Sequence, residues 1–281
     1  MSTTIKVIVF DLDGTLYEDT HHFAYYAKRI EEKLSEDKRE KFRSDYEAVL
    51  SGHHPLKIGS VYDVQRDLIL LVRDGVVKEA YHWDGTKLTA NEIQTIYPNK
   101  ITVNLDNMFS IGDLWWVPSS IGRHYGLNNE DTYQAFLETR KYMMSPQFQM
   151  KPINGLLETL TEIRDDIKLV LMTNSPKPDS EVILEKLGLS MCFHKKIFEA
   201  GKPVKTAERF EWIARIYAVR FDEIMSVGDN LLNDIIPARN LGCKTIYIDS
   251  HKIGNEESAD IVVDKLKDSL EVLRKLANPL H

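Results

Sequence analysis

Short apolar segments that each stop at a polar residue alternate with helical patterns along this chain, and this alternation restricts the fold more than any other feature. The first segment, residues 5–10 (IKVIVF), is β-branched and almost continuously apolar. That pattern is typical of a strand buried on both faces of a parallel sheet. It recurs at residues 167–172, 223–227, 244–248 and 259–263. Because strands that alternate with helices indicate βαβ units, the sequence predicts an α/β fold with a parallel sheet flanked by helices.

A long insertion separates the first of these strands from the others. Its predicted elements are one hairpin, over residues 76–89, and five helices, over residues 20–33, 37–50, 60–73, 91–97 and 130–143. The 281 residues are enough for two domains. We therefore expect a Rossmann-like α/β core from residues 1–17 and 150–281, and an inserted, mainly α-helical cap domain from residues 18–149.

Two aspartates follow the first strand directly, at the end of the sheet where ligands bind in open α/β folds. Asp11 and Asp13 are two positions apart, so an extended chain points both carboxylates the same way. Two close carboxylates repel each other unless a cation lies between them or one is protonated. A cation would keep Asp11 ionised as a nucleophile, and a protonated Asp13 could donate to a leaving group. Two solvated acids beside a glycine turn are the alternative.

A second acidic group follows the segment at residues 223–227. Gly228 and Asp229 stand at the end of that strand, and Asp234 lies in the helical pattern that follows. The helix dipole favours acids at this position, so an ordinary helix cap is one interpretation of Asp229. If both acidic groups end strands of one sheet, their carboxylates would form an oxygen site that suits Mg²⁺.

Two further sites suit a phosphate group. Thr173 and Asn174 follow the segment at residues 167–172, where a hydroxyl, an amide and the next backbone N–H groups could hold phosphoryl oxygens. A plain turn is the alternative. Lys202 precedes Pro203, which favours an extended conformation for the lysine. It would supply positive charge to a phosphate and to the nucleophilic carboxylate, or it would simply be solvated.

Together these residues form an ordered pattern, which reads Asp11-Leu12-Asp13-Gly14-Thr15, then Thr173, then Lys202, then Gly228-Asp229 and Asp234. Through this pattern the chain resembles the haloacid dehalogenase-like (HAD) hydrolase superfamily over roughly residues 4–17 and 150–275. The insertion lies between the first and second motifs, where that family places its helical cap.

The resemblance implies that Asp11 is the nucleophile and forms an aspartyl-phosphate. Asp13 would act as a general acid on the leaving oxygen and then as a base for the hydrolytic water. Members that cleave carbon–halogen bonds lack the second acid, so Asp13 favours a phosphatase over a dehalogenase.

The resemblance also implies how the phosphate and the metal are held. Thr173 and Lys202 would bind the phosphoryl group, and Asn174 remains a candidate beside them. Mg²⁺ would be held by Asp11, the backbone carbonyl of Asp13, and Asp229. Four residues are expected to support the site: Gly14, Thr15, Gly228, and Asp234, which would reach the metal shell or pair with Lys202.

Composition narrows the expected partners and location. The net charge is −7 and no basic stripe is present, so a nucleic acid polymer is not an expected partner. No apolar run approaches the ~20 residues of a membrane span, and the first residues do not resemble a secretory leader. The two cysteines, Cys192 and Cys243, do not form a disulfide framework. We expect a cytoplasmic monomer or homodimer without a membrane partner.

The favoured function is therefore a Mg²⁺-dependent phosphatase that acts on a small phosphorylated metabolite, of the nucleotide or sugar phosphate class. A phosphomutase of the same fold and a non-catalytic regulatory protein that binds a phosphometabolite are the alternatives. The insertion contains Trp83, Trp115 and Trp116, which could stack on a substrate but are more typical of a core.

Overall fold

The computed structural model describes three stretches of the chain: residues 4–73, 75–104 and 106–277. The ends of the expected core domain, residues 1–3 and 278–281, lie outside them, as do positions 74 and 105 of the expected cap. The chain forms two compact units. The core unit runs up to Asp19 and continues from Met144 onward, and the inserted unit is Thr20–Met143. The expected domain boundaries, at residues 18 and 149, stay a prediction.

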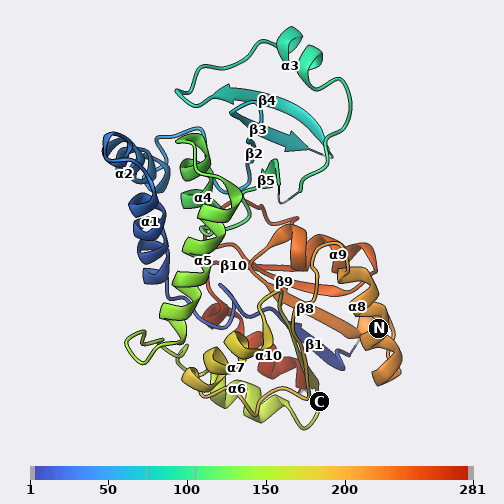
Figure 1. The fold of residues 1–281 in the computed structure, drawn as a ribbon. Helices are drawn as coiled ribbons and strands as arrows, with labels where there is room; N and C mark the ends of the chain where they lie inside the picture. Colours follow the sequence, from blue (N-terminus) through green and yellow to red (C-terminus); the bar gives the residue numbers. More distant parts are fainter. Residues whose placement is uncertain (1–3, 74, 105, 278–281) are drawn as a thin grey trace. The chain divides into compact units, whose positions relative to one another are not determined.

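A six-stranded parallel sheet forms the centre of the core unit (Figure 1). Its order is β10-β9-β8-β1-β6-β7, and its strands are β1 Val7–Phe10, β6 Lys168–Met172, β7 Lys195–Ile197, β8 Ile224–Gly228, β9 Lys244–Ile248 and β10 Ile261–Val263. The predicted α/β class with a Rossmann-like sheet is confirmed. The edge strand β7 was not predicted, because its sequence KKI lacks an apolar run.

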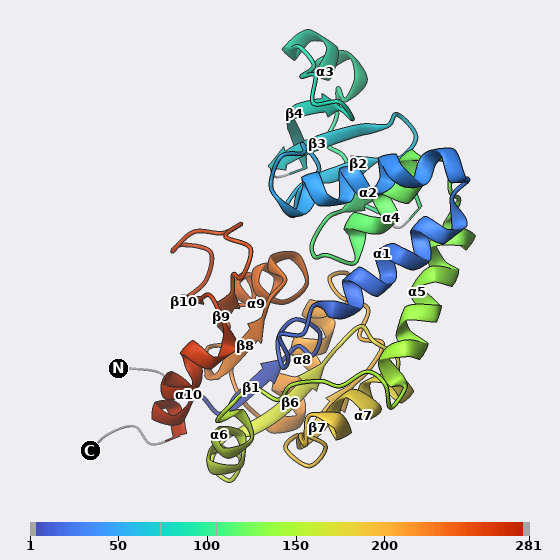
Figure 2. The same ribbon diagram turned by 90° about the vertical axis from the view of Figure 1, so that its left-hand side faces the viewer.

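Helices cover both faces of this sheet. They are α6 Leu156–Ile163, α7 Lys177–Lys186, α8 Thr206–Tyr217, α9 Ile236–Asn240 and α10 Leu270–Ala277. Figure 2 shows α8 and α9 on one face, and α6, α7 and α10 on the other. Alternate residues of β1 face α8, so that Val7 and Val9 share a core with Phe210 and Ile213. Each such side chain contributes about 1.5–3 kcal/mol when it is fully buried.

The strand order reverses direction at β1. The chain passes from β1 outward to β6 and β7, then returns to β8 on the other side of β1. Because every strand is parallel, the carboxyl ends of β1 and β8 meet at this switch point, where open α/β sheets bind ligands. Residues 11 and 229, the first after each of these strands, therefore lie at the place that favours a site.

The segments by which the chain leaves and re-enters the core unit are hydrogen-bonded to each other and to α7. The backbone N–H of Lys151 donates to a carboxylate oxygen of Asp19 at 2.8 Å. The ammonium group of Lys186 donates to the carbonyl oxygens of Ser145 and Phe148, both at 2.7 Å. The two ends of the insertion are thus joined on the core side.

The inserted unit combines helices with an antiparallel sheet in the order β4-β3-β2-β5. Its elements are α1 His21–Lys33, α2 Glu36–Leu50, β2 Val61–Asp63, β3 Leu68–Arg73, β4 Val76–His82, α3 Ala90–Ile96, β5 Met108–Ser110, α4 Trp116–His124 and α5 Asn129–Met144. The helix predicted over residues 60–73 is wrong, because β2 and β3 occupy that stretch. Both faces of β3 are buried, with Ile69 in one cluster and Leu68 and Leu70 in another. A continuous apolar run of this kind suits a buried strand as well as a helix.

The three tryptophans of the insertion pack against a hydrophobic core and are not fully exposed to solvent. Trp83, Trp115 and Trp116 lie partly buried against a cluster built from α1, α2 and α4. The ring of His22, itself 1% exposed, lies 5.1 Å from that of Trp115. Their packing is consistent with a core role. None of the helices in the described part of the chain combines the length and the apolarity that crossing a membrane requires.

One aspartate is fully enclosed in the inserted unit. Asp63 is 1% exposed and accepts hydrogen bonds from the backbone N–H groups of Gln65 and Arg66, both at 3.1 Å. Its second oxygen accepts from the guanidinium of Arg66 at 3.2 Å and from the hydroxyl of Tyr97 at 2.6 Å. This carboxylate is therefore satisfied by four donors and one positive charge.

Candidate active site

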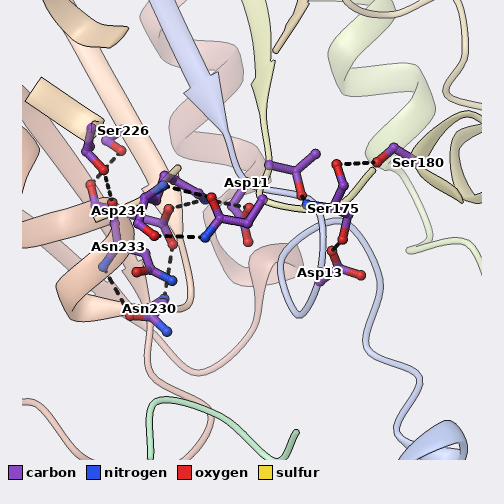
Figure 3. Close-up of polar contacts among 12 residues, drawn as sticks. Asp11, Asp13, Ser175, Ser180, Ser226, Asn230, Asn233 and Asp234 are labelled. Carbon is purple, nitrogen blue, oxygen red and sulfur yellow. Dashed lines mark hydrogen bonds and ion pairs between the residues drawn. The ribbon is translucent and has the colours of Figure 1, made fainter. Parts of the chain in front are cut away.

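A buried lysine lies against the carboxylate that follows β1. The backbone N–H of Asp11 donates to the carbonyl of Val227 at 3.0 Å, so the pairing of β1 with β8 extends to this residue. The ammonium group of Lys202 donates to Asp11 Oδ1 at 2.7 Å and to Asp234 Oδ1 at 2.6 Å. The side chain of Lys202 is only 2% exposed. Figure 3 shows Asp11 and Asp234 with this network of polar contacts around them.

The charges of this group do not balance. Burial raises the pKa of Asp11 to about 7, although Lys202 lowers it, and the charges of Asp234 and Asp13 raise it further. Burial also raises the pKa of Asp234. Burial alone would lower the pKa of Lys202, but the two carboxylates raise it above its ordinary value. The lysine is therefore charged at neutral pH, and one ammonium group faces more than one carboxylate.

The end of β8 carries a further acid into the same group. Asp11, Asp229 and Asp234 each offer a carboxylate oxygen, and these three oxygens lie within 4.8 Å of one another. Gly14 allows this approach, because a Cβ there would lie 2.1 Å from Asp229 Oδ2 and its φ of 77° also favours glycine. A Cβ at Gly228 would likewise lie 2.6 Å from the side chain of Asp234.

This donor set fits a divalent cation. Carboxylate oxygens are the ligands that Mg²⁺ prefers, and the excess negative charge requires a counter-charge in a buried place. Thr15 follows Asp11 and Asp13 closely in the sequence. Its hydroxyl oxygen is buried and has no hydrogen-bond partner among the described residues. The arrangement is therefore chemically suited to a cation held by Asp11 and Asp229.

The turn after β8 is fixed by side chains that the sequence did not single out. The Asn230 side chain accepts from the N–H groups of Leu232 and Asn233, both at 3.1 Å, and so caps the next helical turn. The N–H of Asn230 donates to Asp234 Oδ2 at 3.3 Å, and the hydroxyl of Ser226 donates to the Asp234 carbonyl at 2.8 Å. Asn230 is a strong helix-capping residue type, which is the one signal that could have identified it.

The Asn174 side chain is hydrogen-bonded to both backbone polar groups of Lys202. Its amide group donates to the carbonyl of Lys202 at 2.9 Å and accepts from the N–H of Lys202 at 2.8 Å. The turn after β6 therefore fixes the position of the lysine. Thr173 lies in the same turn, 1% exposed, and its hydroxyl accepts the N–H of Ser175 at 3.1 Å. Direct binding of phosphate by either residue stays a prediction.

The carboxylate of Asp13 lies in the same loop but has different partners. The hydroxyl of Tyr17 donates to Asp13 Oδ1 at 2.7 Å, and the hydroxyl of Ser175 donates to Oδ2 at 2.6 Å. Neither hydroxyl was singled out from the sequence. Ser175 stands next to the predicted pair Thr173-Asn174, which is the only sequence signal for it.

Known proteins resemble this chain in sequence over part or nearly all of its length. A family model described as haloacid dehalogenase-like hydrolase matches residues 5–242. A phosphoglycolate phosphatase of Vibrio parahaemolyticus is 32% identical over 125 residues, which is 41% of this chain and 54% of that protein. A glyceraldehyde 3-phosphate phosphatase of Pyrococcus furiosus is 23% identical over 280 residues, 96% of this chain and 94% of that protein.

Another glyceraldehyde 3-phosphate phosphatase gives a match of intermediate length. The glyceraldehyde 3-phosphate phosphatase of Methanopyrus kandleri is 28% identical over 137 residues, 46% of this chain and 59% of that protein. The matches thus span little more than half of the Vibrio and Methanopyrus proteins, and nearly all of the Pyrococcus protein.

Two solved structures resemble this fold over nearly the whole chain. A predicted phosphoglycolate phosphatase from Haemophilus somnus 129pt has a TM-score of 0.56 at 18% identity, covering 97% of this chain and 99% of its own. A putative HAD-hydrolase, YfnB, from Bacillus subtilis has a TM-score of 0.54 at 15% identity, covering 96% and 99%. At these identities the similarity concerns the fold alone.

Proposed function

Because the chain belongs to the haloacid dehalogenase-like hydrolase family, we propose that it is a Mg²⁺-dependent phosphatase acting on a small phosphorylated metabolite. The observation that carries the proposal is the buried group in which Lys202 bridges Asp11 and Asp234 at the switch point of the sheet. The names of the relatives support phosphomonoester hydrolysis, and the two substrates in those names are both small phosphorylated compounds.

In the first step, the carboxylate of Asp11 attacks the phosphorus of the substrate. The bond between phosphorus and the leaving oxygen breaks, and Asp13 donates a proton to that oxygen. Lys202 orients Asp11 and offsets charge, while the turn at Thr173 would bind phosphoryl oxygens. Phosphoryl transfer depends mostly on positioning and electrostatic stabilisation, which is what these residues supply.

In the second step, Asp13 removes a proton from water, the water oxygen attacks the phosphorus, and the bond to Asp11 breaks. Inorganic phosphate is released and the free carboxylate of Asp11 is restored. Mg²⁺ held by Asp11 and Asp229 would offset negative charge on the phosphoryl oxygens in both steps. We propose in addition that the insertion, residues 18–149, is the cap that selects the substrate.

The test is phosphate release from a panel of phosphomonoesters that contains phosphoglycolate, glyceraldehyde 3-phosphate, sugar phosphates and nucleoside monophosphates. The native protein and Asp11→Asn are each assayed with Mg²⁺ and with a chelator. We expect release only from the native protein with Mg²⁺. Release by Asp11→Asn at the native rate would contradict the proposed nucleophile, and release in chelator would contradict the metal requirement. An isomerised substrate without free phosphate would favour a phosphomutase.

A further inference from the structure

Both oxygens of the Asp13 carboxylate accept a hydrogen bond from a hydroxyl group. Tyr17 donates to Oδ1 at 2.7 Å and Ser175 donates to Oδ2 at 2.6 Å, both within the usual range for strong O–H···O bonds. Figure 3 shows the Ser175 hydroxyl directed at Asp13. The two donors come from different segments, because Tyr17 lies in the loop after β1 and Ser175 lies in the turn after β6.

The two hydroxyls are themselves held in place. Tyr17 is 1% exposed, so its ring is enclosed and the position of its hydroxyl follows from packing. Ser175 donates its N–H to the Thr173 hydroxyl at 3.1 Å, and its carbonyl accepts the N–H of Glu199 at 3.2 Å. The turn that is proposed to bind phosphate therefore also fixes one oxygen of Asp13.

A general acid needs this kind of support. Asp13 is half-buried and stands in an irregular loop, directly before the left-handed turn at Gly14. Without partners, its side chain would sample several rotamers. Proton transfer requires a heavy-atom distance of about 2.6–3.2 Å, and a misplacement of about 1 Å can cost 10²-fold in rate.

We infer that Tyr17 and Ser175 are positioning residues that aim Asp13 at the leaving oxygen, an inference that rests on the proposed phosphatase function. They contact Asp13 and act on the reaction only through it. Their removal therefore weakens proton donation and leaves the attack of Asp11 on phosphorus intact.

The choice of leaving group separates these two effects. An alkyl phosphate releases an alkoxide, which needs a proton, whereas p-nitrophenyl phosphate releases a stabilised phenolate, which does not. A residue that only stabilises the fold would affect both esters equally. A residue that aims the acid affects the alkyl ester much more.

The experiment measures single-turnover release of the leaving group from p-nitrophenyl phosphate and from phosphoglycolate, or from the alkyl phosphate that the panel ranks first. The proteins are the native chain, Tyr17→Phe, Ser175→Ala and the double variant. We expect each single variant to slow the alkyl ester by about 10-fold or more and the nitrophenyl ester by less than about 3-fold. Ser175→Thr keeps the hydroxyl and is expected to restore the alkyl rate.

Tyr62→Phe is the matched control. Tyr62 is also 1% exposed and donates to a carboxylate, that of Asp67, at 2.6 Å, but it lies in the inserted unit. We expect it to leave the ratio of the two rates unchanged. Equal slowing of both esters in Tyr17→Phe and Ser175→Ala, or no slowing of either, would overturn the inference while the proposed function stands. A native protein that cleaves neither ester would contradict the proposed function first.

Discussion

The two units of this chain bury aspartates in opposite ways. Asp63 of the inserted unit has four hydrogen-bond donors, one of which is the guanidinium of Arg66. Asp11 and Asp234 of the core unit share one ammonium group, with Asp229 within 4.8 Å. The first carboxylate is compensated by its own surroundings, and the second group holds an excess of negative charge.

The difference distinguishes a structural role from a functional one. A buried charge is costly unless it is paired, so a fold that only needs stability satisfies each carboxylate completely. A group left with uncompensated charge is suited to bind a cation or to react. Asp→Asn substitutions at Asp11 and Asp63 are therefore expected to have opposite effects on activity and stability.

The largest expected effect is on catalysis. Asp11→Asn replaces the proposed nucleophile with a neutral amide of nearly the same shape, so phosphate release should fall on the order of 10³-fold or more. Asp63→Asn is the control and should retain the native kcat. Steady-state phosphate release with Mg²⁺ measures both. A comparable loss of kcat in Asp63→Asn would show that the comparison between the two carboxylates is wrong.

The second expected effect concerns the ammonium group of Lys202, which Asp11 and Asp234 share. Lys202→Met keeps the length of the side chain but leaves the buried Asp11 and Asp234 without their ammonium partner. Breaking a buried pair in this way costs about 3–5 kcal/mol, and we expect phosphate release to fall about 10²-fold as well. Lys195→Met, at an exposed position of β7, should change the free energy of unfolding by less than about 1 kcal/mol. Urea unfolding of both variants measures this difference. Equal free energies of unfolding would contradict the expectation that Lys202 compensates the charges of Asp11 and Asp234.

The third expected effect is a dependence of stability on pH. The folded state raises the pKa of Asp11 from its ordinary 3.8 to about 7, first through burial. The metal-free folded protein thus holds this proton more tightly than the unfolded chain. The contribution of this group is full below pH 3.8 and is lost as the pH rises to about 7. In chelator, the free energy of unfolding should fall over this window, and Mg²⁺ should restore it most at pH 8.

Asp11→Asn provides the control for that titration. The amide carries no charge at any pH, so the free energy of unfolding of the variant should not show the decrease with pH that is attributed to Asp11. Without metal, the variant should be more stable than the native protein at pH 8. An unchanged pH profile in the variant would assign the fall to other groups.

The smallest expected effect lies in the inserted unit. Asp63→Asn removes the charge that faces Arg66 and replaces one acceptor oxygen with an N–H₂ group. We expect a loss of about 1–3 kcal/mol in the free energy of unfolding. Thermal unfolding measures it. Asp106→Asn, on an exposed residue, is the control. A neutral result at Asp63 would mean that its four donors do not stabilise the unit.

The sequence predicted the core sheet well because its buried strands end at polar residues. The acids Asp11, Asp229 and Asp234 could be placed at one edge of the sheet from their positions after those strands. The hydroxyls of Tyr17 and Ser175 could not, because a contact between the loop after β1 and the turn after β6 leaves no periodic pattern. The role of Asn174 in binding phosphate stays a prediction, and the sequence did not reveal its hydrogen bonds to the backbone of Lys202.

The inserted unit was harder to predict, because its apolar segments fit more than one structure. The run at residues 68–72 (LILLV) is buried on both faces of β3 and carries no alternation that would distinguish it from a helix. The edge strands β5 and β7, of three residues each, were not predicted from the sequence. The nine-residue helix α4 was not predicted either, whereas β10, also three residues long, was predicted from the run at residues 259–263.

The hydrogen bond between Asp19 and the backbone of Lys151 has a consequence for modularity. It joins the outgoing and incoming segments through two residues of the core unit, Asp19 and Lys151. We therefore expect that a short linker between these two positions can replace the inserted unit. If the insertion selects the substrate as proposed, the choice of substrate could be altered there while the proposed catalytic residues of the core unit stay unchanged.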